Sequence, residues 1–398
     1  MKTLFCLMAA FLVLFAAQSR EKPVTLTLNP TLNPPAKDYM VEVPASLVAK
    51  SAGNFIATYG QNTVPVEFVS NLRGERRAIF PVDVNGTTRV TLQEGDIPSY
   101  PKRSYAEIVH KTGGQWEGNK YIGPENWVKS NYMRKPDPCT DHSYYIKYEG
   151  PGWESDKVAY RFYLDWRNGI DLFAKKINDI VLPYIGAANY DSYHNMNYWG
   201  MDVLTVGNAL GLGSIAFWDG TQAQRVAVTD SIITWIPADG RLRSQVRTHY
   251  YGWEANGTRT LLQSLISIDA GSFASHMELQ ADPSIPNLCT GIIKDAKAEL
   301  ITRSEPGSGW SYLATWGQQS LNKDLLGLAV FYRTAQCKQV TSDRLNHVVI
   351  LTPDKGYTEY YFMGLWELDT EGIKTREAFV GYLDNYLARL NHPVKVAR

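Results

Sequence analysis

The chain has 398 residues, of which 44% are hydrophobic, and its 40 Lys and Arg residues balance its 40 Asp and Glu residues. This length permits two or three domains with a large core. Together with the hydrophobic content, it excludes a disordered or fibrous protein. Zero net charge excludes partners held mainly by long-range attraction, such as nucleic acid. The 24 Tyr and 11 Trp residues are typical either of a β core or of a site that stacks on sugar rings.

The first residues predict an export signal. Lys2 is the only charged residue in 1–19, an apolar run extends from Leu4 to Ala17, and Ala17-Gln18-Ser19 offers the small residues that a signal peptidase recognises. The run is shorter than the roughly 20 residues that a membrane span requires. We therefore expect a signal peptide over 1–19, no membrane span, and a periplasmic or secreted protein.

Alternation of apolar and polar residues predicts strands along most of the remaining chain. Residues 158–166 place Tyr160 and Phe162 on one face and Arg161 and Tyr163 on the other, which is the pattern of a half-buried strand. The other predicted strands are 39–43, 54–59, 63–70, 76–82, 87–93, 214–218, 225–229, 241–251, 260–268, 272–280, 311–316, 326–333, 346–351 and 357–366. This number of short strands, separated by turn residues, predicts an all-β fold of stacked antiparallel sheets.

Two segments have helical spacing instead. The apolar residues of 168–183 predict a turn of helix, and the segment from Thr375 to Pro393 predicts a C-terminal helix with Thr375 as its N-cap. Residues 20–98 form an N-terminal β region in this interpretation, and 99–398 form the main domain.

The segment from Asn189 to Asp202 has the most varied chemistry, with three Tyr, one His, one Trp and two Asp. Such a loop suits a binding cleft, because aromatic rings pack on sugar faces while Asp and His supply directed hydrogen bonds. The residues of this segment that we assign to a site are Tyr190, Tyr193, His194, Tyr198, Trp199 and Asp202. The alternative is a well-packed loop in which His194 bonds to the backbone.

Other candidates lie on predicted strands and turns. Arg161 or Arg167 could hold a carboxylate through a two-pronged guanidinium contact, although a solvated sheet face is the stronger explanation for the Arg161 strand. His142 is a further substrate-binding candidate. His276 and Glu278 share a face of 272–280 and could form a metal-ligand pair or a base with its orienting carboxylate.

Several catalytic motifs are absent from the sequence. It contains no H-E-x-x-H, no G-x-S-x-G, no phosphate-binding loop and no dinucleotide-binding fingerprint. Zinc proteases, Ser hydrolases of that type and nucleotide enzymes are therefore disfavoured. We expect no cofactor, while the sequence leaves a divalent metal open and identifies no ligands for it.

Five segments carry a resemblance to a known family. They are EGPGWESDKVAYRFYLDWRNGIDLFAKK (149–176), YDSYHNMNYWGMDVLTVGNALGLG (190–213), NLCTGII (287–293), GWSYLATWGQQSL (309–321) and LGLAVFYR (326–333). They resemble the exported domain-of-unknown-function family of bacterial polysaccharide-utilisation loci, some members of which are described as ulvan oligosaccharide dehydratases. The resemblance implies a galactose-mutarotase-like β-supersandwich that acts on short oligosaccharides with a uronic acid at the non-reducing end.

Removal of water from C4 and C5 of such a glucuronyl residue is a β-elimination. It needs a base for the C5 proton, an acid for the departing hydroxyl, and a cation for the carboxylate. We expect His194 to be the base and Tyr193 the acid, because a Tyr of ordinary pKa, about 10, is a poor base. Arg161 or Arg167 would hold the carboxylate, unless a divalent metal replaces it.

Two other functions remain open. A glycoside hydrolase would use paired carboxylates, for which Asp165, Asp191, Asp202 and Glu154 are available. A non-catalytic sugar-binding or epimerase-like module would bind without eliminating water. The expected partner in every case is an oligosaccharide.

Overall fold

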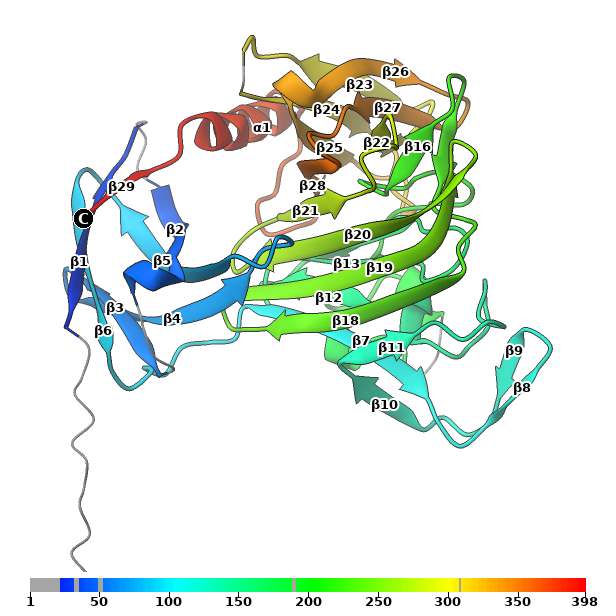
Figure 1. Ribbon diagram of the computed structural model, residues 1–398, viewed down its shortest axis with the longest axis horizontal. Coiled ribbons are helices and arrows are strands. Elements are labelled where there is room, and N and C mark those ends of the chain that lie inside the picture. The colour runs from blue at the N-terminus through cyan, green and yellow to red at the C-terminus, as the bar shows by residue number, and fades with distance from the viewer. Residues whose placement is uncertain (1–21, 32–35, 49–52, 188–190, 308) are drawn as a thin grey trace, which may run out of the picture.

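The structure is a computed structural model that describes residues 22–31, 36–48, 53–187, 191–307 and 309–398 (Figure 1). The expected signal peptide, residues 1–19, lies outside these ranges. Antiparallel sheets make up most of the described chain, and the all-β prediction is confirmed.

Two sheets form a central sandwich. The larger has nine strands in the order β11 (Tyr132–Arg134), β18 (Ser231–Asp239), β19 (Arg243–Ala255), β20 (Thr258–Asp269), β21 (Ala274–Gln280), β28 (Tyr357–Trp366), β25 (Leu326–Arg333), β24 (Trp310–Gly317) and β23 (Ala298–Arg303). The smaller has six, in the order β10 (Trp127–Ser130), β7 (Ser104–Lys111), β12 (Gly152–Ser155), β13 (Val158–Phe162), β14 (Ile170–Lys175) and β15 (Gly200–Asp202). One hydrophobic core joins them, in which the rings of Tyr160 and Phe362 lie 5.5 Å apart.

Smaller sheets flank the sandwich. A five-stranded sheet has the order β17 (Ala223–Arg225), β16 (Ala216–Trp218), β22 (Leu288–Ile293), β27 (Asn346–Leu351) and β26 (Cys337–Ser342), and a hairpin joins β8 (Gln115–Glu117) to β9 (Lys120–Ile122). The β19–β20 hairpin turns at Asn256-Gly257, both at positive φ (52° and 71°), which is why this Asn-Gly pair suits the turn.

A seven-stranded sheet stands to one side of the sandwich (Figure 1). Its strand order is β2 (Ala36–Pro44), β5 (Arg76–Val84), β4 (Asn62–Ser70), β3 (Phe55–Tyr59), β6 (Thr88–Glu94), β1 (Val24–Asn29) and β29 (Lys395–Ala397). We call it the N-terminal sheet, because all of its strands except β29 come from the region expected over 20–98. The C-terminal β29 pairs with β1, with Ala397 opposite Thr27.

The predicted C-terminal helix is confirmed as α1 (Arg376–Asn391). The Thr375 side chain accepts a hydrogen bond from the Ala378 amide, so Thr375 is the N-cap, and the buried Phe379 and Leu383 pack on the core. In the described ranges, no helix has the length and apolar character that crossing a bilayer requires.

The turn of helix predicted within 168–183 is wrong, because residues 170–175 form the strand β14. Ile170 and Leu172 face the sandwich core, whereas Phe173 belongs to a second buried cluster on the opposite face of the sheet. Apolar residues at successive positions therefore imitate helical spacing. The half-buried character predicted for 158–166 is also wrong, since Arg161 is only 2% exposed.

Loops cover the outer face of the six-stranded sheet, and a buried ion pair anchors one of them. Lys175 and Glu154 are both fully buried and bonded to each other. Lys175 also donates to the carbonyl of Asp179 (2.7 Å), while Glu154 accepts from the amides of Val181 (2.9 Å) and Leu182 (2.8 Å). This pair fixes the start of the segment that leads to residues 191–199.

Removal of one partner of this pair should destabilise the protein strongly. We expect Lys175→Met to lower the free energy of unfolding by about 3–5 kcal/mol, because it leaves Glu154 charged and unpaired in the core. The Lys175→Met, Glu154→Gln double variant removes that charge and should recover part of the loss. Urea unfolding of the three proteins tests this expectation, and a double variant less stable than the single one would contradict it.

Candidate functional site

A network of charged side chains lies on the outer face of the six-stranded sheet, and Arg161 of β13 is at its centre. Asp171 of β14 is directly opposite Arg161 in the strand register. The guanidinium donates to Asp171 at 2.7 Å and to Asp202 of β15 at 2.8 Å. The three side chains are at most 2% exposed. We call this group and the residues bonded to it the Arg161 network.

The remaining donors of Arg161 are also used within the protein. They bond to the Tyr148 carbonyl (3.2 Å), the Tyr193 hydroxyl (2.9 Å) and, at a longer 3.4 Å, the Tyr163 hydroxyl, while Nε bonds to Asp171 (3.2 Å). An Arg side chain has five N–H donors, and these contacts account for all of them. A substrate carboxylate could therefore reach Arg161 only by displacing one of its partners.

Two carboxylates share this one guanidinium. Burial, followed by the nearby charge of Asp202, raises the pKa of Asp171 to about 7. The Tyr163 hydroxyl donates to the same Asp171 oxygen at 2.6 Å. The carboxylate pair consequently retains a proton close to neutral pH, which limits the negative charge buried beside Arg161.

His194 connects the network to solvent. It ends a short 3-10 turn (Ser192–His194), and its side chain is 39% exposed. Its Nε2 lies 3.3 Å from Asp202, and the hydrogen bond to that carboxylate raises the pKa of His194. An accessible imidazole held by a buried carboxylate has the geometry of a general base or acid.

Arg167 forms a second centre beside the first. It bonds to Asp165 (2.6 Å) and Asp141 (2.7 Å) and lies 3.1 Å from Glu149. Glu149 is also 4.0 Å from Arg161, so it links the two guanidinium groups. Among the residues that the structure describes, Nη1 of Arg167 bonds only to Asp141, whose side chain is 46% exposed.

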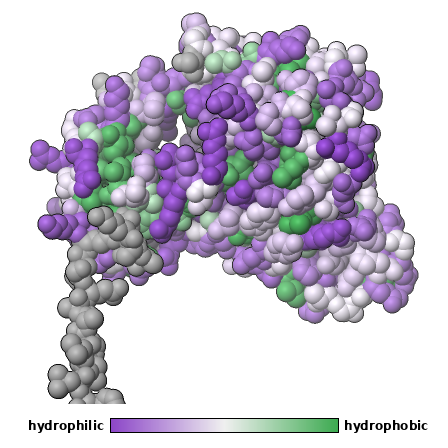
Figure 2. All heavy atoms as spheres, in the orientation of Figure 1, coloured by the Kyte–Doolittle hydropathy of each residue, from purple (hydrophilic) through white to green (hydrophobic). Residues whose placement is uncertain are grey.

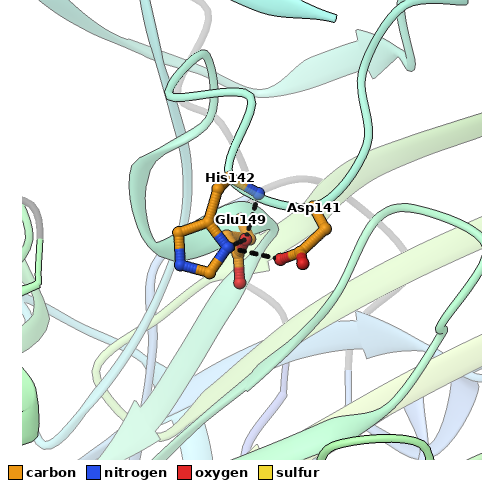
Figure 3. Close-up of side chains that lie close together, drawn as sticks. All are labelled: Asp141, His142 and Glu149. Carbon is orange, nitrogen blue, oxygen red and sulfur yellow. Dashed lines mark hydrogen bonds and ion pairs between the residues drawn. The ribbon is translucent and has the colours of Figure 1, made fainter.

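His142 completes the exposed edge of this second centre (Figure 3). Its Nδ1 is 2.6 Å from Asp141 and 3.7 Å from Glu149. The candidate ligand atoms of Asp141, His142 and Glu149 lie within 4.8 Å of one another and could hold a metal ion. Arg167 already contacts both carboxylates, so a metal would compete with that guanidinium.

The backbone is strained around this edge. His142, Tyr148 and Glu149 have φ values of 51°, 39° and 69°, in the left-handed region that side chains with a Cβ rarely adopt. Such conformations persist only where surrounding contacts hold them, and they concentrate at functional sites. Here these backbone conformations place the Glu149 carboxylate between the Arg161 and Arg167 guanidinium groups.

The structure brings six of the nine predicted site residues into this one network: Arg161, Arg167, Tyr193, His194, Asp202 and His142. Tyr198 is 69% exposed on the same loop. Tyr190 lies outside the described residues. Trp199 is only 3% exposed and packs against Phe173, so its ring is a core residue and offers no open face for a sugar.

The residues that were missed are Asp141, Tyr148, Glu149 and Asp171, which supply contacts to the two Arg residues and His142. Asp171 had a signal in the sequence, because it is the one charged residue among the apolar residues 170–174. A charge inside a buried strand requires a partner. The strained turn at Tyr148 and Glu149 had no comparable signal.

The raised pKa of Asp171 predicts a pH-dependent contribution to stability. The pKa is about 7 in the folded protein against 3.8 ordinarily, so this contribution is complete below about pH 4 and is lost as the pH rises to about 7. Asp171→Asn should therefore lose less stability than the wild type over this range in urea unfolding. The exposed Asp191→Asn is the control, and equal pH slopes for wild type and Asp171→Asn would contradict the assignment.

Three known proteins similar to the chain share little identity with it. Uncharacterized protein P7 of Formosa agariphila is 22% identical over an alignment of 421 positions, which covers 99% of this chain and 98% of that protein. Two solved structures from Enterococcus faecalis, a protein in glycosyl hydrolase family 38 (TM-score 0.43) and an alpha-mannosidase (TM-score 0.45), are each 10% identical over 94% of this chain. The chain spans less than half of either, 47% and 45%. A family model described as Domain of unknown function (DUF4861) matches residues 29–396, and the chain belongs to this family.

Proposed function

We propose that the protein is a carbohydrate-active enzyme that eliminates water from the terminal uronic acid of a short oligosaccharide. The observation that carries this proposal is His194, whose half-exposed ring is held by the buried Asp202 beside the Arg161 guanidinium. The resemblance to a family with ulvan oligosaccharide dehydratases supports the substrate class. Export through the expected signal peptide would place this activity in the periplasm or outside the cell.

His194 acts as the base in this reaction. It accepts the C5 proton, and the electron pair of the broken C–H bond forms the C4–C5 double bond. The C4–O bond breaks, and the departing oxygen takes up a proton and leaves as water. The charge of Asp202 stabilises the imidazolium that results.

Tyr193 supplies the proton to the departing oxygen in this proposal. Because Tyr193 is only 2% exposed, this role requires the Ser192–His194 turn to move when the substrate binds. Burial raises the pKa of Tyr193 above its usual value, so the hydroxyl stays protonated, as a general acid requires. That oxygen accepts a hydrogen bond from Arg161, which leaves its own proton available to donate. The rings of Tyr193 and His194 are 4.5 Å apart, which puts acid and base side by side.

Arg167 is the better of the two predicted partners for the uronate carboxylate. All the donors of Arg161 are bonded within the protein, whereas Arg167 meets the half-exposed Asp141 at the rim of the network. A substrate carboxylate can take the place of Asp141 on Nη1 without leaving a buried charge unpaired, because the displaced Asp141 moves into solvent.

A hydrolase with paired carboxylates fits this region less well. Of its four candidate acids, Asp165, Asp202 and Glu154 are at most 2% exposed and ion-paired, and Asp191 is the exposed one. Two accessible carboxylates facing one glycosidic bond are not available from this set.

Product analysis tests the reaction. We expect uronic-acid oligosaccharides to lose one water, seen by mass, and to gain the ultraviolet absorbance of an unsaturated uronide. His194→Ala should lower kcat by about 10²–10⁴-fold, while the exposed His392→Ala should not. Gain of one water would indicate hydrolysis, unchanged substrate would favour a binding module, and full activity of a folded His194→Ala would overturn the role of His194.

The pH profile tests how Asp202 acts. Only neutral His194 can accept a proton, and its pKa is raised above 6.5, so kcat/KM should fall as the pH drops through that raised value. Asp202→Asn removes the negative charge that raises the pKa of His194. The acid limb of the profile should therefore move to lower pH in this variant. An unmoved limb would show that Asp202 does not set the pKa of the catalytic base.

A further inference from the structure

A cavity of about 380 Å³ lies between the N-terminal sheet and the outer face of the nine-stranded sheet. Figure 2 shows the molecule hollowed between these two parts. The lining comes from β2, β4 and β5 on one side, from β19, β20, β21 and β28 on the other, and from Tyr386 of α1. This volume is within the range of about 300–1,000 Å³ that small-molecule sites occupy.

The cavity is separate from the Arg161 network. His276 of β21 lines the cavity, while the next residue, Met277, packs in the sandwich core. In the same way, Arg161 follows Tyr160, which packs in that core from the other sheet. Successive strand residues point to opposite faces, so the cavity and the Arg161 network lie on opposite outer faces of the sandwich.

Two neighbouring carboxylates line the cavity but have different bonding partners. Glu278 and Glu359 are directly opposite each other on β21 and β28. Glu359 bonds to His276 (3.0 Å) and to Arg333 (2.6 Å). Glu278 is only 4% exposed, and its hydrogen bonds come from the Leu72 amide (3.3 Å) and the Tyr357 hydroxyl (3.0 Å). It therefore faces the cavity as an acceptor without an ion-pair partner among the described residues.

The positive charges of the lining are already balanced. Arg243 bonds to Asp269 (2.5 Å) and Glu42 (2.6 Å), and Arg77 bonds to the same Glu42 (3.1 Å). With these guanidinium groups paired and Glu278 without a cation, an anionic ligand would be repelled. A neutral ligand rich in hydroxyl groups can instead donate to Glu278 and accept from neighbouring donors.

Aromatic side chains give the cavity apolar surface beside these polar groups. Tyr361 stacks on His276 with ring centres 4.3 Å apart, and Tyr386 meets Tyr361 edge to face at 6.1 Å. A neighbouring cavity of about 600 Å³ shares Tyr357 and Glu359 with this one.

From these features we propose that the cavity is a second saccharide site, which binds one or two units of a neutral sugar with Glu278 accepting from their hydroxyl groups. Tyr357 and Tyr386 contribute hydroxyl groups and ring surface to the same ligand. The site is independent of the reaction proposed for His194. It favours an uncharged sugar, whereas the Arg161 network favours a charged one. The uronic acid belongs at the Arg161 network, and the uncharged sugar belongs here.

Calorimetric titration of the mature protein with neutral hexoses, neutral disaccharides and glucuronate tests this site. We expect saturable binding of a neutral saccharide that an excess of glucuronate does not displace from this cavity. Glu278→Gln keeps the side-chain shape but loses the charge, so the affinity should fall about tenfold. Tyr386→Phe, which keeps the ring, should also weaken binding, while Glu254→Gln, an exposed carboxylate on β19 of the same sheet, should not.

The controls separate this site from the first. His194→Ala should retain the neutral-sugar affinity, and Glu278→Gln should retain turnover of uronic-acid oligosaccharides. Equal thermal unfolding midpoints would show that the variants are folded. The proposal is overturned if no neutral saccharide binds, if glucuronate displaces the bound neutral saccharide, or if folded Glu278→Gln and Tyr386→Phe bind the neutral saccharide like the wild type.

Discussion

Burial of the Arg161 guanidinium is the constraint around which the site is arranged. A charge that is 2% exposed is stable only if every donor has a partner. Those partners come from β14, β15, the strained turn at Tyr148 and the short turn at Tyr193. Charge pairing therefore brings together segments between residues 148 and 202 and fixes the position of the His194 loop.

The sheet architecture could be predicted from the sequence where one face of a strand meets polar surroundings. In β19, Val246 and Tyr250 are buried in the sandwich while Arg243 and Arg247 point outward, so the alternation is clear. It fails in β14, whose two faces are both buried. Period-two reasoning gives relative faces, but it cannot show that loops cover the second face.

The same limit explains which parts of the site were predictable. Residue chemistry made His194, Asp202 and Arg167 candidates, because imidazole, carboxylate and guanidinium groups supply directed hydrogen bonds and charge. Exposure could not be inferred, and Trp199 became a core residue because Phe173 lies beneath it. Asp171 was missed because its importance depends on Arg161 opposite it. Local sequence patterns do not show which residues of two strands lie opposite each other.

The pairing of β1 with β29 has a consequence for how the chain folds. These strands are separated by almost the entire sequence, so their contact is among the most non-local in the molecule and carries a large loop-closure entropy. Until Lys395–Ala397 is in place, β1 is an open sheet edge, which is a template for pairing with another chain. We therefore expect completion of the N-terminal sheet to come late in folding, with aggregation competing during that interval.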